Sequence, residues 1–509
     1  MRAPLFSKLL GVLSGRRPSA SALLHENALP GTEDWVLTKP AFKREIEGYA
    51  SVCSVSRGGT LDLYVNTEAS SYTIQVFRMG WYGGRGARRV LGPVTARGLR
   101  QTIPIPDPET GLIDCDWQSP VTLAVGADWR SGVYLAKLEE SAGHCQSYVI
   151  FVVRDDSDDA DVVFQLPVNT YQAYNFWGGR QAYGWGSGDG LPWGSTAGRA
   201  AVVISFNRPY AASTNPSASF GMGAGEFLCN VQPVSTGYPI SSAGWDYNLV
   251  RWLEREGYRV TYVTNVDSHN SPELFNRRRV FISGAHDEYW SWEGRANLER
   301  ALTTGTNLFF SGANAIYWQV RSEKDGRGRP DRLLAIYKEK ARKLDPVLLD
   351  NDPSNDRLAT TQWRLPPVSR PEDALIGIAY LMDPFDADIV VSDASHWAFA
   401  NTGLVNGSGL AGLLGYEVDG LLGNAPDGLR VLATSPAKNL KDPSKIVVSN
   451  MAAYVAPSGA EVFATGSMQW SWGLDDFNAP HLRTSRLNPA AVQITRNVLE
   501  RFGAKRYSS

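Results

Sequence analysis

Residues 286–289 place four chemically active side chains next to one another: His286, Asp287, Glu288 and Tyr289. They supply a base that titrates near neutral pH, two carboxylates and a phenol. Such groups transfer protons in hydrolytic reactions, and their oxygen atoms bind hard metal ions. Ionisable side chains between a strand and a helix also cap the helix, so a structural role is an equal alternative for each of them.

The flanking sequence predicts a strand–helix–strand unit that would position these four residues. Short apolar runs at Val280–Ile282 and Leu308–Phe310 predict the strands, and Ser291 suits the N-cap of the helix between them. The apolar residues of this helix share one face: Leu298, Ala301 and Leu302. Ligands bind beyond the carboxyl ends of parallel strands, so the turns after both strands are the expected site. Asn314 follows the second strand and is a candidate substrate-pocket residue.

Two further segments carry candidate residues. The loop 169–179 follows a predicted strand at Val162–Gln165, and its Asn175 and Trp177 could line a substrate pocket; packing of its aromatic rings beneath the loop is an equal alternative. Glu417 shares a face with Asp419 if residues 413–419 form a strand, which alone predicts only an edge strand.

The familiar catalytic motifs are absent from the sequence. We find no phosphate-binding G-x-x-x-x-G-K-[ST] loop, no H-E-x-x-H and no G-x-S-x-G elbow. Ala285 stands in the tight turn after the first strand, where a nucleophile is often found. An enzyme of this sequence therefore does not use a Ser or Cys nucleophile at that turn.

Length and composition predict a globular protein of two domains. The chain has 509 residues, of which 43% are hydrophobic and 20% charged, and this is too long for one ordinary core. Its formal charge of −2 offers no basic surface for nucleic acid. None of the four cysteines forms a C-x-x-C pair, which argues against a structural zinc site, although Cys115 and Cys145 could pair with each other.

The amino-terminal stretch MRAPLFSKLLGVLSGRRPSASALL has only a superficial likeness to a signal peptide. Lys8 interrupts its apolar run, and Arg16 and Arg17 follow that run instead of preceding it. No segment reaches the roughly 18 apolar residues of a membrane span. We therefore expect a cytoplasmic protein that does not interact with a membrane.

The order of predicted elements divides the chain into three parts. Residues 1–44 form an N-terminal extension, and residues 45–156 contain short alternating segments that predict an antiparallel β-sandwich. Residues 157–509 alternate strands and helices, which predicts an α/β domain with a doubly wound, mainly parallel sheet. The acidic segment 154–159 is the expected boundary. Asp246 and Asn488 suit the starts of two of the helices.

Several of these segments resemble one family. GWDYNLVRWLEREGYRVTYVTNVD, SGAHDEYWSWEGRANLERALTTGTNLFFSGANAIYWQVR and LLGYEVDG are similar to the carboxyl-terminal domain of the N,N-dimethylformamidase large-subunit family. VFRMGWYGGRGARRV, SYVIFVVRDD and NTYQAYNFWGGRQAYG resemble the amino-terminal sandwich and the junction of the same family. The resemblance extends over roughly residues 45–505.

The resemblance implies a β-sandwich followed by a domain similar to class I glutamine amidotransferases, without their cysteine nucleophile. It also implies a mononuclear Fe(III) held by two tyrosines and one glutamate, for which Tyr289, Tyr247 and Glu417 are the candidates. His286, Asp287 or Glu288 would then transfer protons. A separate small subunit is an implied partner, and we expect an oligomer.

The first functional hypothesis is a metal-dependent hydrolase of a C–N bond in a small amide-like substrate. One alternative is a non-catalytic protein that binds a small ligand such as a carbohydrate. Another is a metal-free hydrolase that uses His286 with Asp287 or Glu288. The hypotheses differ in whether oxygen-bearing side chains converge on one point.

Overall fold

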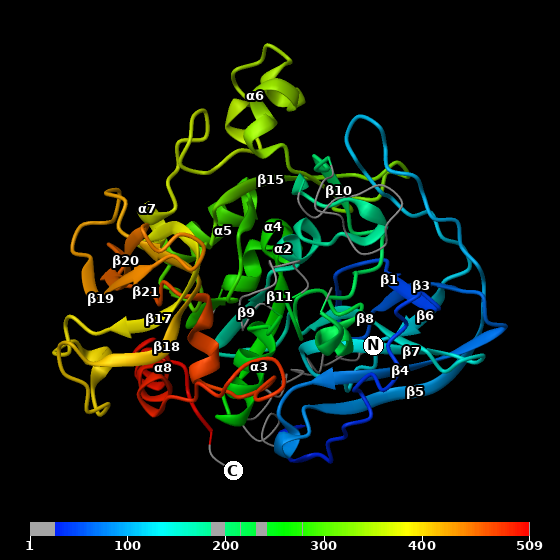
Figure 1. The fold of residues 1–509 in the computed structure, drawn as a ribbon, viewed down its shortest axis with the longest axis horizontal. Coiled ribbons are helices and arrows are strands. Elements are labelled where there is room, and N and C mark those ends of the chain that lie inside the picture. The colour runs from blue at the N-terminus through cyan, green and yellow to red at the C-terminus, as the bar shows by residue number, and fades with distance from the viewer. Residues whose placement is uncertain (1–25, 185–198, 214, 231–241, 277, 508–509) are drawn as a thin grey trace, which may run out of the picture.

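A computed structural model describes residues 26–184, 199–213, 215–230, 242–276 and 278–507 (Figure 1). The signal-like stretch at residues 1–24 lies outside the described residues. In Figure 1 the N-terminal β-sheets (blue) lie at one side of the molecule, and strands from the last third of the chain (yellow and orange) lie at the opposite side. No helix in the described ranges is both long and apolar enough to cross a membrane.

The N-terminal part consists of two β-sheets. The strands of the larger sheet are, in spatial order, β2 (Ser54–Ser56), β8 (Gln146–Arg154), β7 (Gly132–Glu140), β4 (Ser71–Met79) and β5 (Ala87–Arg97); those of the smaller sheet are β1 (Ile46–Ala50), β3 (Thr60–Thr67) and β6 (Val121–Ala124). Buried residues alternate along β3 and β4, as expected of strands with one face in a core. Cys115 and Cys145 are both free thiols, so they do not pair.

A seven-stranded sheet forms the centre of the molecule. Its strands are, in spatial order, β11 (Val260–Thr264), β9 (Val162–Leu166), β12 (Val280–Ser283), β14 (Asn307–Phe310), β21 (Glu461–Ala464), β20 (Ile446–Val455) and β19 (Arg430–Lys438). The first five strands are parallel, and the last two are antiparallel to their neighbours. The predicted strands at Val162–Gln165, Val280–Ile282 and Leu308–Phe310 are confirmed.

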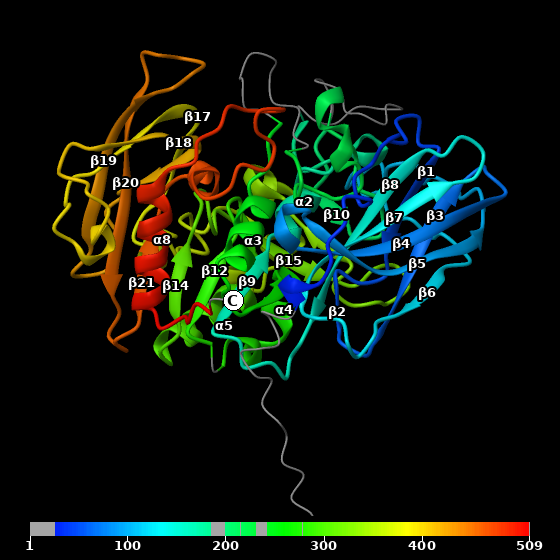
Figure 2. The ribbon, with the colours of Figure 1, turned by 90° about the horizontal axis from the view of Figure 1, so that it is seen from below.

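Helices cover both faces of the central sheet. Alternate strand residues belong to different cores: Phe164 and Ile282 pack with α3 (Asp246–Arg255) and α8 (Pro489–Arg501), whereas Phe281 and Leu308 pack with α5 (Trp292–Thr303). Figure 2 shows α8 beside β14 and β21. The parallel strands are therefore buried on both faces, which explains their continuous apolar runs.

Smaller elements complete the fold. They are a four-stranded sheet of β10 (Val203–Ser205), β16 (Leu333–Ala335), β15 (Trp318–Glu323) and β13 (Tyr289–Ser291), a pair of β17 (Ala379–Val390) and β18 (Gly409–Gly420), and the short helices α2 (Val168–Ala173), α4 (Asn265–Asn270), α6 (Ala341–Leu344) and α7 (Asp373–Ile376). The strand predicted around Glu417 is thus part of β18.

Two of the three helix N-caps predicted from the sequence are confirmed. Ser291 Oγ accepts a hydrogen bond from the Gly294 backbone, and Asn488 Oδ1 accepts from the first turn of α8, so both predicted caps are confirmed. The cap predicted at Asp246 is wrong, because this residue is already helical and its side chain makes no cap hydrogen bond. The glutamine amidotransferase-like and sandwich assignments, and the domain boundary at 154–159, stay predictions.

Candidate functional site

The turns after several strands meet at the carboxyl edge of the central sheet. The chain enters this sheet at β9, adds β11 on one side and then adds β12 on the other side. The reversal leaves a crevice beyond the ends of β9 and β12, which is where open parallel sheets bind ligands. Tyr174 follows β9, and His286 and Glu288 follow β12, so the strand order itself brings these residues together.

Two tyrosines and one glutamate form the centre of the site. Tyr174 Oη donates a hydrogen bond to Glu288 Oε2 at 2.7 Å, and Tyr183 Oη donates to Glu288 Oε1 at 3.0 Å. The two phenol oxygens lie 3.1 Å apart. Tyr289 Oη donates to Tyr183 Oη at 2.6 Å. Each carboxylate oxygen of Glu288 thus faces a different phenol, and Tyr289 joins the cluster through Tyr183.

His286 lies against this cluster and against two further carboxylates. Its Nε2 is 3.3 Å from Glu288 Oε2 and 3.6 Å from Glu417 Oε2, and its Nδ1 is 3.7 Å from Glu226 Oε2. Burial lowers the pKa of His286, but Glu417, Glu226 and Glu288 outweigh burial, and the pKa is raised well above its ordinary value. Burial also raises the pKa of Glu417. Both shifts favour the protonated form of the group concerned.

The phenols of the site are held in their protonated form. Burial raises the pKa of Tyr174, Tyr183 and Tyr289 well above the ordinary value, and the charge of Glu288 raises it further. All three hydroxyls can therefore act as hydrogen-bond donors. A cation placed among their oxygen atoms would reverse this shift, because it stabilises phenolates.

Lys338 brings a positive charge to the same place. Its Nζ lies 3.0 Å from the centroid of the Tyr183 ring and 5.4 Å from that of Trp318. The side chain is buried, and its ammonium finds no hydrogen-bond acceptor among the described residues. Burial lowers the pKa of Lys338 to about 7, an effect that Glu288 opposes. Its φ of +55° is uncommon for a residue with a long side chain. Buried donors without an acceptor are rare and point to a functional role.

Asn314 and Glu417 lie side by side at this edge. The backbone N–H of Asn314 donates to Asp419 Oδ1 at 2.8 Å, which ties the turn after β14 to β18. The Asn314 side chain is hydrogen-bonded to Glu417. This hydrogen bond lowers the pKa of Glu417, which burial raises. The structure thus brings together His286, Glu288, Tyr289, Asn314 and Glu417 from the residues singled out in the sequence.

Tyr247 and Asp287 do not join this cluster. Tyr247 Oη donates to the backbone carbonyl of Gly86 at 2.5 Å, and its ring packs between Trp35 and Phe477, so its assignment as a metal ligand is corrected. The Asp287 carboxylate accepts hydrogen bonds from three other side chains: Gln165, Asn265 and Ser283. Asp287 therefore anchors the turn through these three hydrogen bonds.

Asn175 and Trp177 also have structural partners. The Asn175 amide donates to Gln172 Oε1 and the Pro209 carbonyl, and its oxygen accepts from the Trp177 and Ala211 backbones. Trp177 Nε1 donates to Glu47 Oε2 at 2.7 Å. Both side chains are therefore engaged in hydrogen bonds to neighbouring segments, and their assignment to a substrate pocket stays a prediction.

Sequence reasoning missed Tyr174, Tyr183, Glu226 and Lys338. A signal existed for Tyr174, because its loop follows β9 and the carboxyl ends of parallel strands share one edge. Tyr183 is only nine residues further along the same loop region. Glu226 comes from an irregular segment and Lys338 from a short 3-10 helix, and neither has a recognisable motif, so only tertiary structure brings them here.

Comparisons with known proteins agree with the sequence resemblance. A family model described as N,N-dimethylformamidase beta subunit-like, C-terminal, matches residues 73–484. Two similar curated proteins are both named N,N-dimethylformamidase beta subunit. The one from Alcaligenes sp is 32% identical over 82 residues, which are 16% of this chain and 11% of that protein. The one from Paracoccus aminophilus is 22% identical over 323 residues, which are 50% of this chain and 36% of that protein.

The chain thus spans 36% or less of the length of these two relatives. Among solved structures, one titled mmIFT52 N-terminal domain matches 50% of this chain and 89% of its own, with 9% identity and a TM-score of 0.25. A likeness of that size supports no argument about fold or function.

Proposed function

This chain belongs to the N,N-dimethylformamidase beta subunit-like family, and from that premise we propose that it hydrolyses a C–N bond of a small amide. The observation that carries the proposal is the pairing of both Glu288 oxygens with the phenols of Tyr174 and Tyr183. The two carboxylate oxygens and the two phenol oxygens, linked by three contacts of 2.7–3.1 Å, form a compact set of hard donors at the crevice of the sheet.

These residues fit a mononuclear ferric ion. Two phenols and one carboxylate are the donor types that hard cations prefer. Among the described residues, no group of three or more His, Cys, Asp and Glu side chains could hold a metal ion, so phenol oxygens would have to take part. We assign Tyr174, Tyr183 and Glu288 as the ligands, in place of Tyr247, Tyr289 and Glu417. When bound, the ion would supply Lewis acidity toward the amide carbonyl and lower the pKa of water.

The remaining residues divide the work of proton transfer and charge stabilisation. His286 and Glu417, 3.6 Å apart, hold a proton beside Glu288 and deliver it to the nitrogen of the departing amine. The Lys338 ammonium, with unused N–H donors, stabilises the negative charge that develops on the carbonyl oxygen. Asn314 orients Glu417 through its hydrogen bond. Tyr289 orients Tyr183.

A metal-free hydrolase has one observation in its favour. His286 Nε2 contacts Glu288 Oε2 at 3.3 Å, so a base and a carboxylate are already paired. In that mechanism Glu288 would orient the imidazole, and His286 would activate water.

Both curated relatives are named as beta subunits, and we propose that a second type of subunit associates with this chain as well.

The ligand assignment is tested by metal content and colour. Wild-type protein, expressed with iron, should contain about one iron per chain and show a visible absorption band from phenolate-to-iron charge transfer. Tyr174→Phe, Tyr183→Phe and Glu288→Gln should each lose iron and colour. Tyr289→Phe is the matched control, because Tyr289 touches Tyr183 but not Glu288, and it should keep iron.

The activity is tested with small amides such as formamide and N-alkylformamides, by release of the amine. Glu417→Gln, His286→Asn and Lys338→Met should keep iron, whereas kcat should fall by roughly 10²–10⁴. Hydrolysis by an iron-free protein would support the metal-free mechanism. A protein that neither holds iron nor hydrolyses any amide, with and without candidate partner subunits, would refute the hydrolase proposal.

A further inference from the structure

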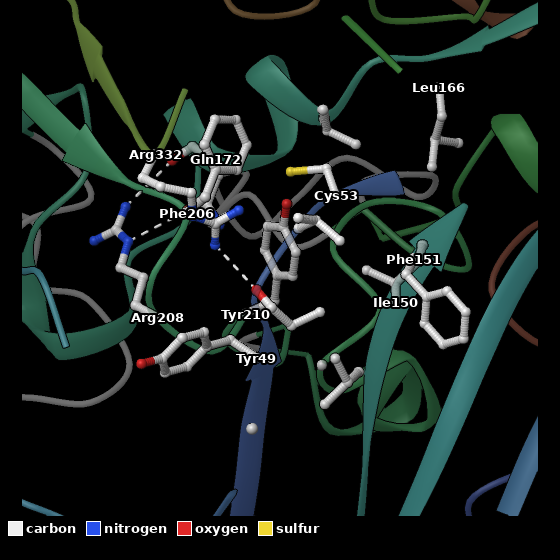
Figure 3. Close-up of a pocket in the computed structure, with 16 residues that line it drawn as sticks. Tyr49, Cys53, Ile150, Phe151, Leu166, Gln172, Phe206, Arg208, Tyr210 and Arg332 are labelled. Atoms are coloured by element: carbon white, nitrogen blue, oxygen red, sulfur yellow. Dashed lines mark hydrogen bonds between the residues drawn. The ribbon is translucent and has the colours of Figure 1, made fainter. Parts of the chain in front are cut away.

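A small cavity lies behind α2, on the side of this helix that faces the N-terminal sheets (Figure 3). Its volume is about 30 Å³, enough for one small ion or one or two waters but not for a phosphate or a sugar. Apolar residues from β1, β8 and β9 form much of its wall. Its polar wall consists of Cys53, Gln172, Arg208, Tyr210 and Arg332.

Two of these polar residues carry a buried positive charge. Arg208 and Arg332 are 1% and 4% exposed, and no carboxylate of the described residues lies within ion-pair distance of either guanidinium. Burial lowers the pKa of both, and that of Arg208 to about 10. A buried charge without an opposite charge is strongly unfavourable, and proteins normally pair it. The two positive charges on the wall of one cavity therefore favour the binding of an anion there.

The two guanidinium groups differ in how far their donors are used. Arg208 donates to carbonyl oxygens of Gln172, Trp177 and Arg180, so its donors hold the loop after α2. Arg332 donates from Nε to Asn207 Oδ1 at 2.8 Å and from Nη2 to the Ala50 carbonyl at 3.0 Å, and its guanidinium is also hydrogen-bonded to the Cys53 thiol. Figure 3 shows the Arg332 guanidinium pointing between Phe206, Gln172 and Tyr210.

From this arrangement we propose that the cavity binds one small monovalent anion, of the size of chloride, with Arg332 as its principal partner. The Tyr210 hydroxyl is a second polar group on the same wall. Chloride fits both the volume and the charge, whereas a multivalent oxyanion exceeds the volume.

The position of α2 gives the anion a structural role. Gln172 lines the cavity, while Asn169 on the same helix donates to the Tyr289 carbonyl and Thr170 Oγ1 accepts from the Glu288 backbone. An anion in the cavity would therefore stabilise the helix that supports the tyrosine–carboxylate cluster from behind. This inference does not depend on whether the cluster hydrolyses amides.

The first experiment compares thermal unfolding in sodium chloride, sodium bromide and sodium gluconate at equal ionic strength. Gluconate is too large for the cavity, so wild-type protein should unfold several degrees higher in the two halides. Arg332→Met should lose this halide dependence. Arg364→Met is the matched control, because it removes the same charge from a site that already has Glu372 as a carboxylate partner at 3.0 Å; it should keep the halide dependence.

The second experiment needs no variant and decides the matter if Arg332→Met fails to fold. Crystals of wild-type protein grown in sodium bromide should show an anomalous bromine peak within hydrogen-bonding distance of the Arg332 guanidinium. Bromine peaks confined to the protein surface, or equal unfolding temperatures in halide and gluconate, would overturn the proposal.

Discussion

Asp287 and Glu288 are adjacent and carry the same functional group, but their surroundings are opposite. Glu288 accepts hydrogen bonds from two phenols in the crevice. Asp287 points back under the turn, where two amides and one hydroxyl donate to it. Because the hydrogen bonds of Asp287 hold it beneath the turn, only Glu288 faces the crevice. We therefore expect their removal to have different consequences.

Asp287→Asn should destabilise the protein by about 1–3 kcal/mol. The amide cannot accept at both of its ends, so its N–H₂ group would face a donor from Gln165, Asn265 or Ser283 in a buried place. Urea-induced unfolding measures this change. Ser283→Ala is the graded comparison, because it removes only one of the three donors and should cost about 1 kcal/mol. An Asn variant as stable as wild type would contradict the anchoring role.

His396 gives a prediction about stability and pH. Burial and the charge of Arg430 lower the pKa of His396 to about 4, whereas Asp393 opposes the shift. Below pH 6.5, the ordinary pKa of histidine, His396 is protonated in the unfolded chain but stays neutral in the folded protein. The free energy of unfolding therefore decreases as the pH falls from 6.5 toward 4. His396→Asn keeps an acceptor for the Ala398 backbone but does not titrate.

The free energy of unfolding of His396→Asn should therefore decrease less than that of wild type between pH 7 and 4.5, by roughly 2–3 kcal/mol. Urea unfolding at several pH values measures the difference. Curves that stay parallel over this range would show that His396 is not responsible for the pH dependence.

Residue types and spacing predicted part of the site. Glu288, His286 and Asn314 could be found because they directly follow apolar runs that become β12 and β14. Tyr247 was misassigned because its position at the start of α3 says nothing about the direction of its ring, which turns toward Gly86. Lys338 could not be found, because its approach to Tyr183 depends on contacts between residues far apart in the chain.

Among the helices and strands, local sequence patterns were sufficient to predict an element where burial or helix capping alone determined it. The caps at Ser291 and Asn488 and the parallel strands were predicted because burial and capping leave clear sequence patterns. The strand β17 was not predicted: it contains Pro384 and acidic residues, and its register with β18 shifts several times. Such a strand is held by tertiary contacts and not by its own pattern.

The turns after β12 and β14 approach each other closely at Gly312. A Cβ atom at this position would lie 1.9 Å from the Ala285 carbonyl oxygen and 2.5 Å from its carbon. Ala285 precedes His286, so any displacement moves the crevice. Gly312→Ala should destabilise the protein by about 1–3 kcal/mol and lower amide hydrolysis.

Gly326→Ala is the matched control for that substitution. A Cβ atom at Gly326 would meet nothing within 4 Å, and the same change should leave unfolding and hydrolysis nearly unaffected. Thermal unfolding and the amide assay report the two effects separately. Equal behaviour of the two alanine variants would show that the turns can separate without strain.

At the scale of the whole molecule, a buried ion pair joins the N-terminal sheets to the central part. Arg78 of β4 donates to both oxygens of Glu254 in α3, at 2.8 and 2.9 Å, and both side chains are 1% exposed. Tyr82 and Tyr262 add hydrogen bonds to the same two residues. The two parts therefore share one buried polar network. If either part unfolded alone, the charged residue of the other part would lose its ion-pair partner.

Glu254→Met should destabilise the protein by about 3–5 kcal/mol, because it leaves the Arg78 guanidinium buried without its carboxylate. Replacing both residues together, as Arg78→Met with Glu254→Met, should cost less than the single change, since no unpaired charge remains. Urea unfolding of wild type, both single variants and the double variant gives the coupling energy between the two positions. If the double variant lost as much as the sum of the two single variants, the pair would not act as one unit. Strong coupling, in contrast, would show that the N-terminal sheets and α3 are stabilised by one shared ion pair.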